Sequence, residues 1–238
     1  MSAPTGEVIF ANIRQYVREP VNLALLAIVP PLFVIAMSGA IGTFSDVLGG
    51  NLGERAGAGL SGLWAAMILT GVASFFLAIA SARVDARLVL AGLRPASVAA
   101  GHALVTVAIA LATSAVSVAI LLSTQEVAKL DALFAAILLA SLIYGSMGFL
   151  LSVYVHGDLE GSFVIILIFM LDAFVGGPLA SGQGLLADLM PVRFPSEIAV
   201  AAMIDAPVQG EWWLWSLLYL VAVAVPASVA IMRRKVVQ

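Results

Sequence analysis

The sequence predicts an all-α membrane protein with about six transmembrane helices and no separate soluble domain. Of its 238 residues, 62% are apolar and 11% are charged, and the mean hydropathy is +1.11. Soluble domains are about 45–50% apolar and about 25% charged, so much of the surface of this chain must face lipid. The length allows about six spans of roughly 20 residues with short connections. We therefore expect one membrane domain over residues 1–238.

The first element expected along the chain is an amphipathic segment over residues 7–19 (EVIFANIRQYVRE). At about 100° per residue its apolar side chains fall on one side of a helix, and Arg14 and Arg18 lie together on the polar side. This pattern predicts an N-terminal elbow helix lying in the headgroup plane. The alternative is a frayed amphipathic tail.

Six apolar segments long enough to span a bilayer follow this elbow. Pro30 and Pro31 predict a kink in the first of them. The Gly-rich, polar stretch 42–59 predicts a loop between the first two spans, and Trp212, Trp213 and Trp215 open the last span as an aromatic belt. The predicted spans are 21–41, 60–82, 103–122, 133–155, 162–179 and 212–232.

Residues 180–211, between the fifth and sixth spans, are too polar and too often interrupted to cross the membrane. They contain two short apolar pieces, 185–190 and 198–204, separated by the sequence MPVRFP. Apolar pieces of this length are typical of re-entrant or interfacial helices. We therefore expect a broken, re-entrant or short-helix segment here.

The basic residues predict the orientation of the chain. With six spans, both termini lie on the same side as the connections after the second and fourth spans. All eleven Lys and Arg residues fall on that side except Arg55, Lys129 and Arg193. Because basic residues remain cytoplasmic, we expect a multi-pass protein of the cell (plasma) membrane with both termini in the cytoplasm.

Asp172 is the one ionisable residue well inside a predicted span. A carboxylate at this depth costs roughly 2.5–3.5 kcal/mol on insertion scales, so it must face water or a polar partner. Two readings remain open. Asp172 is either a functional intramembrane group or a structural hydrogen-bonding residue near the Gly176-Gly177-Pro178 break.

Enzymatic chemistry on this chain is not indicated. Cysteine is absent, and the two histidines, His102 and His156, lie far apart with no clustered partners, so a metal site is not expected. A P-loop needs Gly-Lys followed by Ser or Thr, but Lys129 follows Ala128 and Lys235 follows Arg234. We expect no catalytic residues, no cofactor and no metal on this chain.

The most charged connection, residues 83–102, carries the strongest functional pattern. Charged residues come first, apolar residues follow, and Gly92 and Pro95 interrupt the segment, with Ser97 as a candidate cap for the next helix. A solvated loop is one reading. The other is a short helix that docks onto a protein partner, with these contact residues: Arg83, Asp85, Arg87, Leu90, Gly92, Leu93, Arg94 and Pro95.

The chain resembles the permease subunits of ABC type-2 exporters along nearly its whole length. The resemblance rests on the elbow segment, on DARLVLAGLRPASV (85–98), on a tight connection HGDLEG (156–161), and on the proline-broken segment GGPLASGQGLLADLMPVRFPSEIAVAA (176–202). In that family the connection after the second span is the coupling helix that contacts a separate ATP-binding subunit. It often begins with Glu, where this chain has Asp85.

The resemblance implies a transport subunit that moves a hydrophobic or amphiphilic substrate such as a drug or lipid. ATP and Mg would bind to a separate P-loop ATPase subunit, and a second permease copy or a paralogue would complete the membrane domain, in contact with membrane lipid and without nucleic acid. One alternative is an ion-coupled carrier or channel that uses Asp172. Another is a structural or biogenesis subunit.

Overall fold

The computed structural model describes residues 20–47, 52–155, 157–178 and 185–233. These residues form helices and connections, with no strand among them. The elements are α2 (Pro20–Val47), α3 (Glu54–Leu90), α4 (Pro95–Thr124), α5 (Leu130–Tyr154), α6 (Asp158–Leu171), the π-helical turn η1 (Asp172–Gly176), α7 (Leu185–Asp188), α8 (Arg193–Met203) and α9 (Gly210–Arg233).

Six helical stretches in the described residues are long and apolar enough to cross a membrane, as the sequence predicts. They lie in α2, α3, α4 and α5, across α6 and η1, and in α9. Each of these stretches has at least 18 residues, which is long enough to cross the hydrocarbon core of a bilayer. The multi-pass membrane character expected from the sequence is thus supported.

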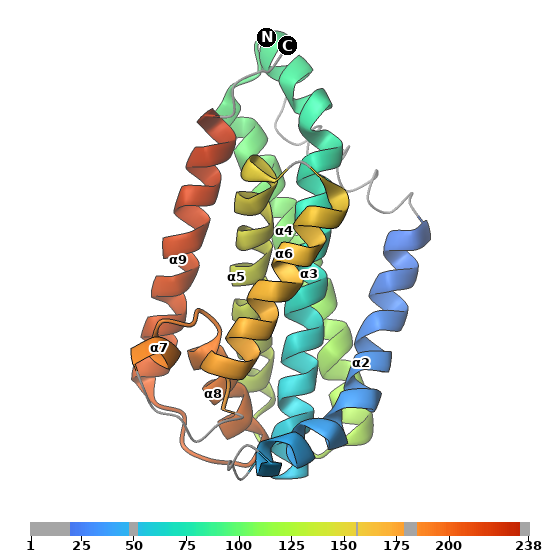
Figure 1. Ribbon diagram of the computed structural model, residues 1–238, viewed down its shortest axis with the longest axis vertical. Coiled ribbons are helices and arrows are strands. Elements are labelled where there is room, and N and C mark those ends of the chain that lie inside the picture. Colours follow the sequence, from blue (N-terminus) through green and yellow to red (C-terminus); the bar gives the residue numbers. More distant parts are fainter. Residues whose placement is uncertain (1–19, 48–51, 156, 179–184, 234–238) are drawn as a thin grey trace.

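The long helices form one elongated bundle with α3 and α5 at its centre (Figure 1). Helix α3 packs against α2, α4 and α5, while α9 packs on the other side against α5, α4 and α8. Two thirds of the most apolar stretch of α3 is buried, against 11% of that of α9. The outer helices therefore leave most of their apolar surface available to lipid or to another chain.

Small residues set the distance between the central helices. A Cβ atom on Gly148 of α5 would collide with the carbonyl oxygen of Gly71 of α3, and one on Gly57 would lie 2.9 Å from the carbonyl oxygen of Ser38 in α2. Small residues permit this close backbone approach in membrane helices. The spacing of Ser141, Gly145, Gly148 and Ser152 in the sequence predicts such packing, and all four are buried on α5.

The loop predicted over residues 42–59 is shorter in the structure, so both of its predicted ends are wrong. Helix α2 continues to Val47 and α3 starts at Glu54, although this stretch is rich in glycine. Packing overrides the low helix propensity of glycine here, because Ile41 and Ala56 are buried. The Ser45 hydroxyl accepts a hydrogen bond from the amide of Leu52 at 3.3 Å and so links the two helix ends.

The connection predicted over residues 83–102 is likewise shorter in the structure. Helix α3 continues through the charged residues to Leu90, and α4 starts at Pro95, so the turn is Ala91–Arg94. Gly92 has φ +97°, a left-handed conformation that glycine adopts at helix ends with little cost. Ser97 is not the cap: Arg94 takes that position and Pro95 begins the helix.

Residues 180–211 contain the short helices α7 and α8 before α9 begins at Gly210. Helices α7 and α8 lie at the end of the bundle opposite the α3–α4 turn (Figure 1). Helix α2 continues through Pro30 and Pro31. Asp158 begins α6, so the helix takes up part of the predicted connection 156–161. The predicted elbow helix, with Arg14 and Arg18, lies outside the described residues.

Candidate functional site

Helices α3 and α4 form a hairpin that extends beyond the thickness of a bilayer. The 37 residues of α3 span about 55 Å, against a hydrocarbon thickness of about 30 Å. Residues 56–82 carry no charge and alone span about 40 Å. The part of α3 from Arg83 to Leu90, together with the start of α4, therefore projects outside the hydrocarbon region.

The residues predicted from the sequence as partner contacts gather at this projecting tip. Arg83, Arg87, Arg94, Gly92 and Pro95 are exposed, and Leu93 is half-buried. Leu90 is 73% exposed, which leaves a large apolar side chain beside arginines at the end of the hairpin. The structure therefore brings these predicted residues to one surface.

Asp85 departs from this group, because its side chain points into the hairpin. Its Oδ2 atom lies 2.7 Å from Nε2 of His102 in α4. An ionised carboxylate only accepts hydrogen bonds, so Nε2 of the imidazole carries the proton that joins them. Ser81 of α3 lies 3.4 Å from the same nitrogen, and its hydroxyl donates to the carbonyl oxygen of Leu77.

His102 also contacts a third helix. Its ring lies edge-on to the ring of Phe149 in α5, with 5.2 Å between the ring centroids. The imidazole is 2% exposed, and its Nδ1 atom has no hydrogen-bond partner within the described residues. His102 thus joins α3, α4 and α5 at the base of the projecting hairpin.

This cluster was not predicted from the sequence, because Asp85 and His102 are 17 residues apart in the chain. A signal was nevertheless present. Ser81 and Asp85 share one face of a helix, being four residues apart, and an antiparallel hairpin that turns at residues 91–94 brings that face to the level of His102. Knowing that the turn was this short would have predicted the pairing.

Asp172 is the first residue of the π-helical turn η1, where the fifth span changes from α-helix to π-helix. Its carboxylate is 3% exposed. Tyr144 of α5 donates its hydroxyl to Oδ2 at 3.0 Å, and the amide of Val192 donates to Oδ1 at 3.4 Å. The side chain therefore links α5 and η1 to the start of α8, an arrangement that favours the structural reading of this residue.

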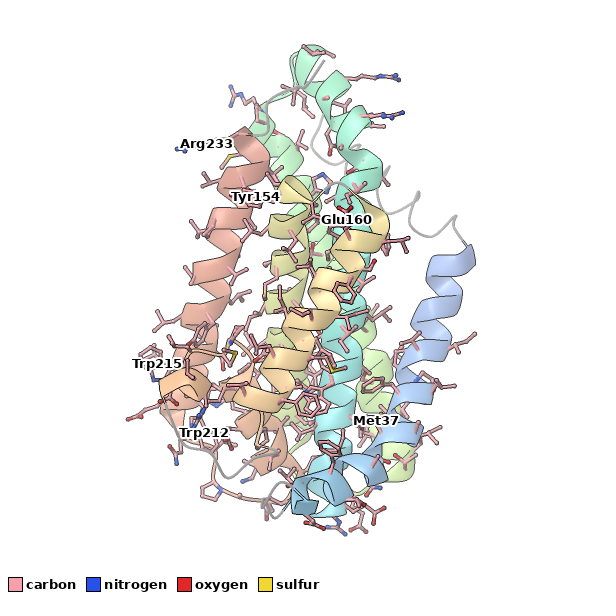
Figure 2. The ribbon with its side chains drawn as sticks, in the orientation of Figure 1. Met37, Tyr154, Glu160, Trp212, Trp215 and Arg233 are labelled. Atoms are coloured by element: carbon pink, nitrogen blue, oxygen red, sulfur yellow. The ribbon has the colours of Figure 1, made fainter. Side chains whose placement is uncertain are left out.

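Ion pairs hold the connections at the α8 end of the bundle. Arg55 pairs with Glu126 at 2.8 Å, Lys129 with Asp205 at 3.3 Å, and Arg193 with Asp188 at 3.2 Å. The three basic residues predicted to lie on the side opposite the others are therefore at one end of the bundle. Figure 2 shows Arg233 at the opposite end of α9 from Trp212 and Trp215.

Among the described Asp and Glu residues outside the predicted spans, Glu197 on α8 is the one whose pKa is clearly shifted. Burial raises the pKa of its carboxyl above the ordinary value of 4.5, and the Arg193 guanidinium partly offsets this. Arg193 lies one turn earlier on the same helix. The cost of removing the carboxylate from water therefore exceeds its electrostatic attraction to the guanidinium.

The part of the chain that the structure describes shows no cluster of metal-binding side chains. Within it, no group of three or more His, Asp or Glu side chains is arranged to hold a metal ion. The features that stand out are instead the projecting hairpin, its base at His102 and the link through Asp172. No family model matches the sequence, and no curated protein matches it.

Proposed function

We propose that this chain is the membrane-spanning permease subunit of an ATP-driven exporter of the ABC type-2 kind. The chain moves a hydrophobic or amphiphilic substrate and relies on a separate P-loop ATPase subunit. The observation that carries the proposal is the α3–α4 hairpin, whose tip extends beyond the hydrocarbon region with Leu90 73% exposed. An exposed apolar side chain among arginines at the end of a helical hairpin suits docking onto a protein partner.

The base of the hairpin supports a mechanical role for it. Most tip residues are exposed, whereas His102 at the base contacts Asp85 of α3 and Phe149 of α5. A movement of the tip would be transmitted through these contacts to α5, one of the two central helices of the bundle. In this account ATP binding moves the partner subunit, and the hairpin tilts the core helices between two arrangements.

The sparse burial of the outer helices supports a membrane domain of two copies or of two paralogues. Only 28% of the apolar stretch of α2 and 33% of that across α6 and η1 are buried within the described chain. Large side chains project from both helices, among them Ile35 and Phe163 at 67% and 66% exposure. A second permease chain would cover part of this surface, and lipid would cover the rest.

The distribution of charge supports an orientation with the hairpin tip in the cytoplasm. Arg83, Arg87 and Arg94 lie at the tip, and Arg233 ends α9 at the same end of the bundle (Figure 2). Basic residues favour the cytoplasmic side, which is where ATP is available. The proposal therefore places the protein in the plasma membrane with both termini cytoplasmic.

The ion-coupled carrier is less well supported. Both carboxylate oxygens of Asp172 accept hydrogen bonds, from Tyr144 and from Val192. A coupling ion would also have to reach a carboxylate that is only 3% exposed.

Transport in membrane vesicles separates the two readings. The exporter should require ATP and should continue when proton and sodium gradients are collapsed, and a P-loop ATPase should co-purify in mild detergent. Transport that needs an ion gradient and proceeds without ATP would overturn the proposal.

A further inference from the structure

A cavity of about 490 Å³ opens between the start of α5 and the start of α9. Both helix starts lie at the α8 end of the bundle, opposite the α3–α4 turn (Figure 1). Its volume falls within the range of roughly 300–1,000 Å³ that is usual for small-molecule sites. The residues that line it are Lys129, Asp131, Ala132, Ala135, Val208 and Trp213.

Two opposite charges line this cavity. The ammonium of Lys129 is fixed in place, because its Nζ atom donates to the carbonyl oxygen of Ala206 at 2.8 Å and pairs with Asp205 at 3.3 Å. An ammonium has three protons to donate, so capacity remains for a ligand anion. Asp131 is exposed and has neither a hydrogen bond nor an ion pair within the described residues.

The third polar feature of the cavity is the indole of Trp213. Indole rings attract cations to their faces and prefer the depth of the lipid headgroups. Trp213 is half-buried and lies between Trp212 and Trp215 in the chain, and Figure 2 shows these two neighbours at the α8 end of α9. The cavity is therefore at headgroup level.

Apolar surface continues from the cavity toward the middle of the bundle. On α5, Leu139 and Leu142 lie one and two turns beyond Ala135 on the same face and are half-buried. On α9, Leu217 lies one turn beyond Trp213 and is 49% exposed. Because so little of α9 is buried, lipid acyl chains can lie along this surface.

We propose that this cavity binds the headgroup of a zwitterionic glycerophospholipid from the surrounding leaflet. Lys129 binds the phosphodiester, Asp131 and the face of Trp213 bind the ammonium, and the acyl chains follow α5 and α9. The site requires only that the chain lies in a membrane, and it does not depend on an ATPase partner.

Native mass spectrometry of the full-length protein, released from nanodiscs, tests the site. The nanodiscs contain equal amounts of phosphatidylethanolamine and phosphatidylglycerol with identical acyl chains. We expect the wild-type protein to retain phosphatidylethanolamine up to about fivefold more than phosphatidylglycerol, the effect of one weak charge contact. Asp131→Asn should abolish this preference, and Lys129→Met should reduce retention of both lipids.

Asp46→Asn is the matched control, because Asp46 is an exposed acid at the same end of the bundle but outside the cavity. It should leave the preference unchanged. If Asp131→Asn fails to fold, Trp213→Leu should produce the same loss of preference. Equal retention of both lipids by the wild-type protein, or equal effects of Asp131→Asn and Asp46→Asn, would overturn the proposal.

Soluble glycerophosphoethanolamine identifies the source of the headgroup. It carries the same phosphodiester and ammonium without acyl chains. At the molar concentration of the lipid it should not displace the bound phospholipid, since it lacks the contacts along α5 and α9. Displacement at that concentration would contradict a membrane lipid as the ligand.

Discussion

His102 of α4 and Asp85 of α3 are joined by a contact of 2.7 Å between Nε2 and Oδ2, at the base of the hairpin that projects from the bundle. The imidazole is buried, whereas the side chain of Asp85 is 16% exposed. Because the contact crosses between the two arms of the hairpin, it fixes their register where they leave the membrane.

Replacing Asp85 tests this contact. Asp85→Ala leaves the buried Nε2–H of His102 without its acceptor, which costs about 1–3 kcal/mol, so the midpoint of thermal unfolding in detergent should fall. Asp85→Asn keeps a hydrogen-bond acceptor and should cost less. Arg83→Ala changes an exposed residue one half-turn away and should leave the midpoint nearly unchanged. Equal effects of Asp85→Ala and Arg83→Ala would contradict a structural role for the contact.

Gly92 tests the conformation of the turn. Its φ of +97° is strained for an L side chain, and a Cβ there meets nothing within 4 Å, so Gly92→Ala should cost about 1–2 kcal/mol through the backbone alone. In the proposed exporter, disrupting Gly92–Pro95 should uncouple ATP hydrolysis from transport. Gly39 of α2 also has nothing within 4 Å but no positive φ, so Gly39→Ala should stabilise the fold slightly. A neutral Gly92→Ala would show that the turn has a different conformation.

Asp172 distinguishes structural from ion-coupling roles. Asn can still accept the hydroxyl of Tyr144 and loses only the longer contact of 3.4 Å from the amide of Val192. Asp172→Asn should therefore reduce transport only mildly, and less than disruption of Gly92–Pro95. Asp172→Ala leaves the buried Tyr144 hydroxyl without its acceptor and should destabilise the protein by about 1–3 kcal/mol. Vesicle transport and thermal unfolding measure the two effects. Complete loss of transport in a stably folded Asp172→Asn variant would favour the carrier reading.

Gly148 tests the packing of the two central helices. A Cβ at this position would collide with the backbone of Gly71, so Gly148→Ala must separate α3 from α5, at a cost of about 1–3 kcal/mol or more. The fraction that elutes as folded protein in size-exclusion chromatography should fall. Gly210→Ala, at a glycine with open space around it, is the control. Normal folding of Gly148→Ala would contradict the close α3–α5 contact.

The raised pKa of Glu197 predicts that the stability of the protein depends on pH. Its pKa is raised above 4.5 in the folded protein by burial, so the native state holds the proton more strongly than the unfolded state. This contribution to the free energy of unfolding is fully present below the pKa that Glu197 has in the unfolded state. It is lost as the pH rises through the higher pKa of the folded state. Glu197→Gln should therefore stabilise the protein more at about pH 7 than at about pH 4, measured as the shift in unfolding midpoint. An equal shift at both pH values would contradict this assignment.

The sequence predicted the six long helices because a bilayer demands apolar runs of nearly fixed length. It misplaced their ends because a charge marks the edge of the hydrocarbon, not the end of a helix. Arg83, Asp85 and Arg87 are compatible with helix, so α3 continues through them until Gly92 ends it. The predicted loop at 42–59 failed for a related reason: burial of Ile41 and Ala56 outweighed the local preference of glycine.

The candidate site was predicted in part. The exposed tip residues follow from charge and from the Gly-Pro pattern, and Asp172 stands out because an acid inside a span is costly. The partners of the two acids were not predicted. Tyr144 reaches Asp172 from another helix, and His102 reaches Asp85 only because the α3–α4 turn is short. Such pairs depend on the three-dimensional register of helices, which the pattern of one helix does not encode.

Site-specific cross-linking from the hairpin tip tests the proposed ATPase partner most directly. The natural sequence has no cysteine, so a single Ala91→Cys substitution at an exposed tip position can carry a maleimide-linked photo-cross-linker in native membranes. Thr43→Cys, exposed at the opposite end of the bundle, is the matched control. We predict that Ala91→Cys captures a P-loop ATPase, identified by mass spectrometry, with a yield that changes when ATP is added, and that Thr43→Cys does not. Absence of an ATPase from the Ala91→Cys product, or equal capture from both positions, would contradict the account.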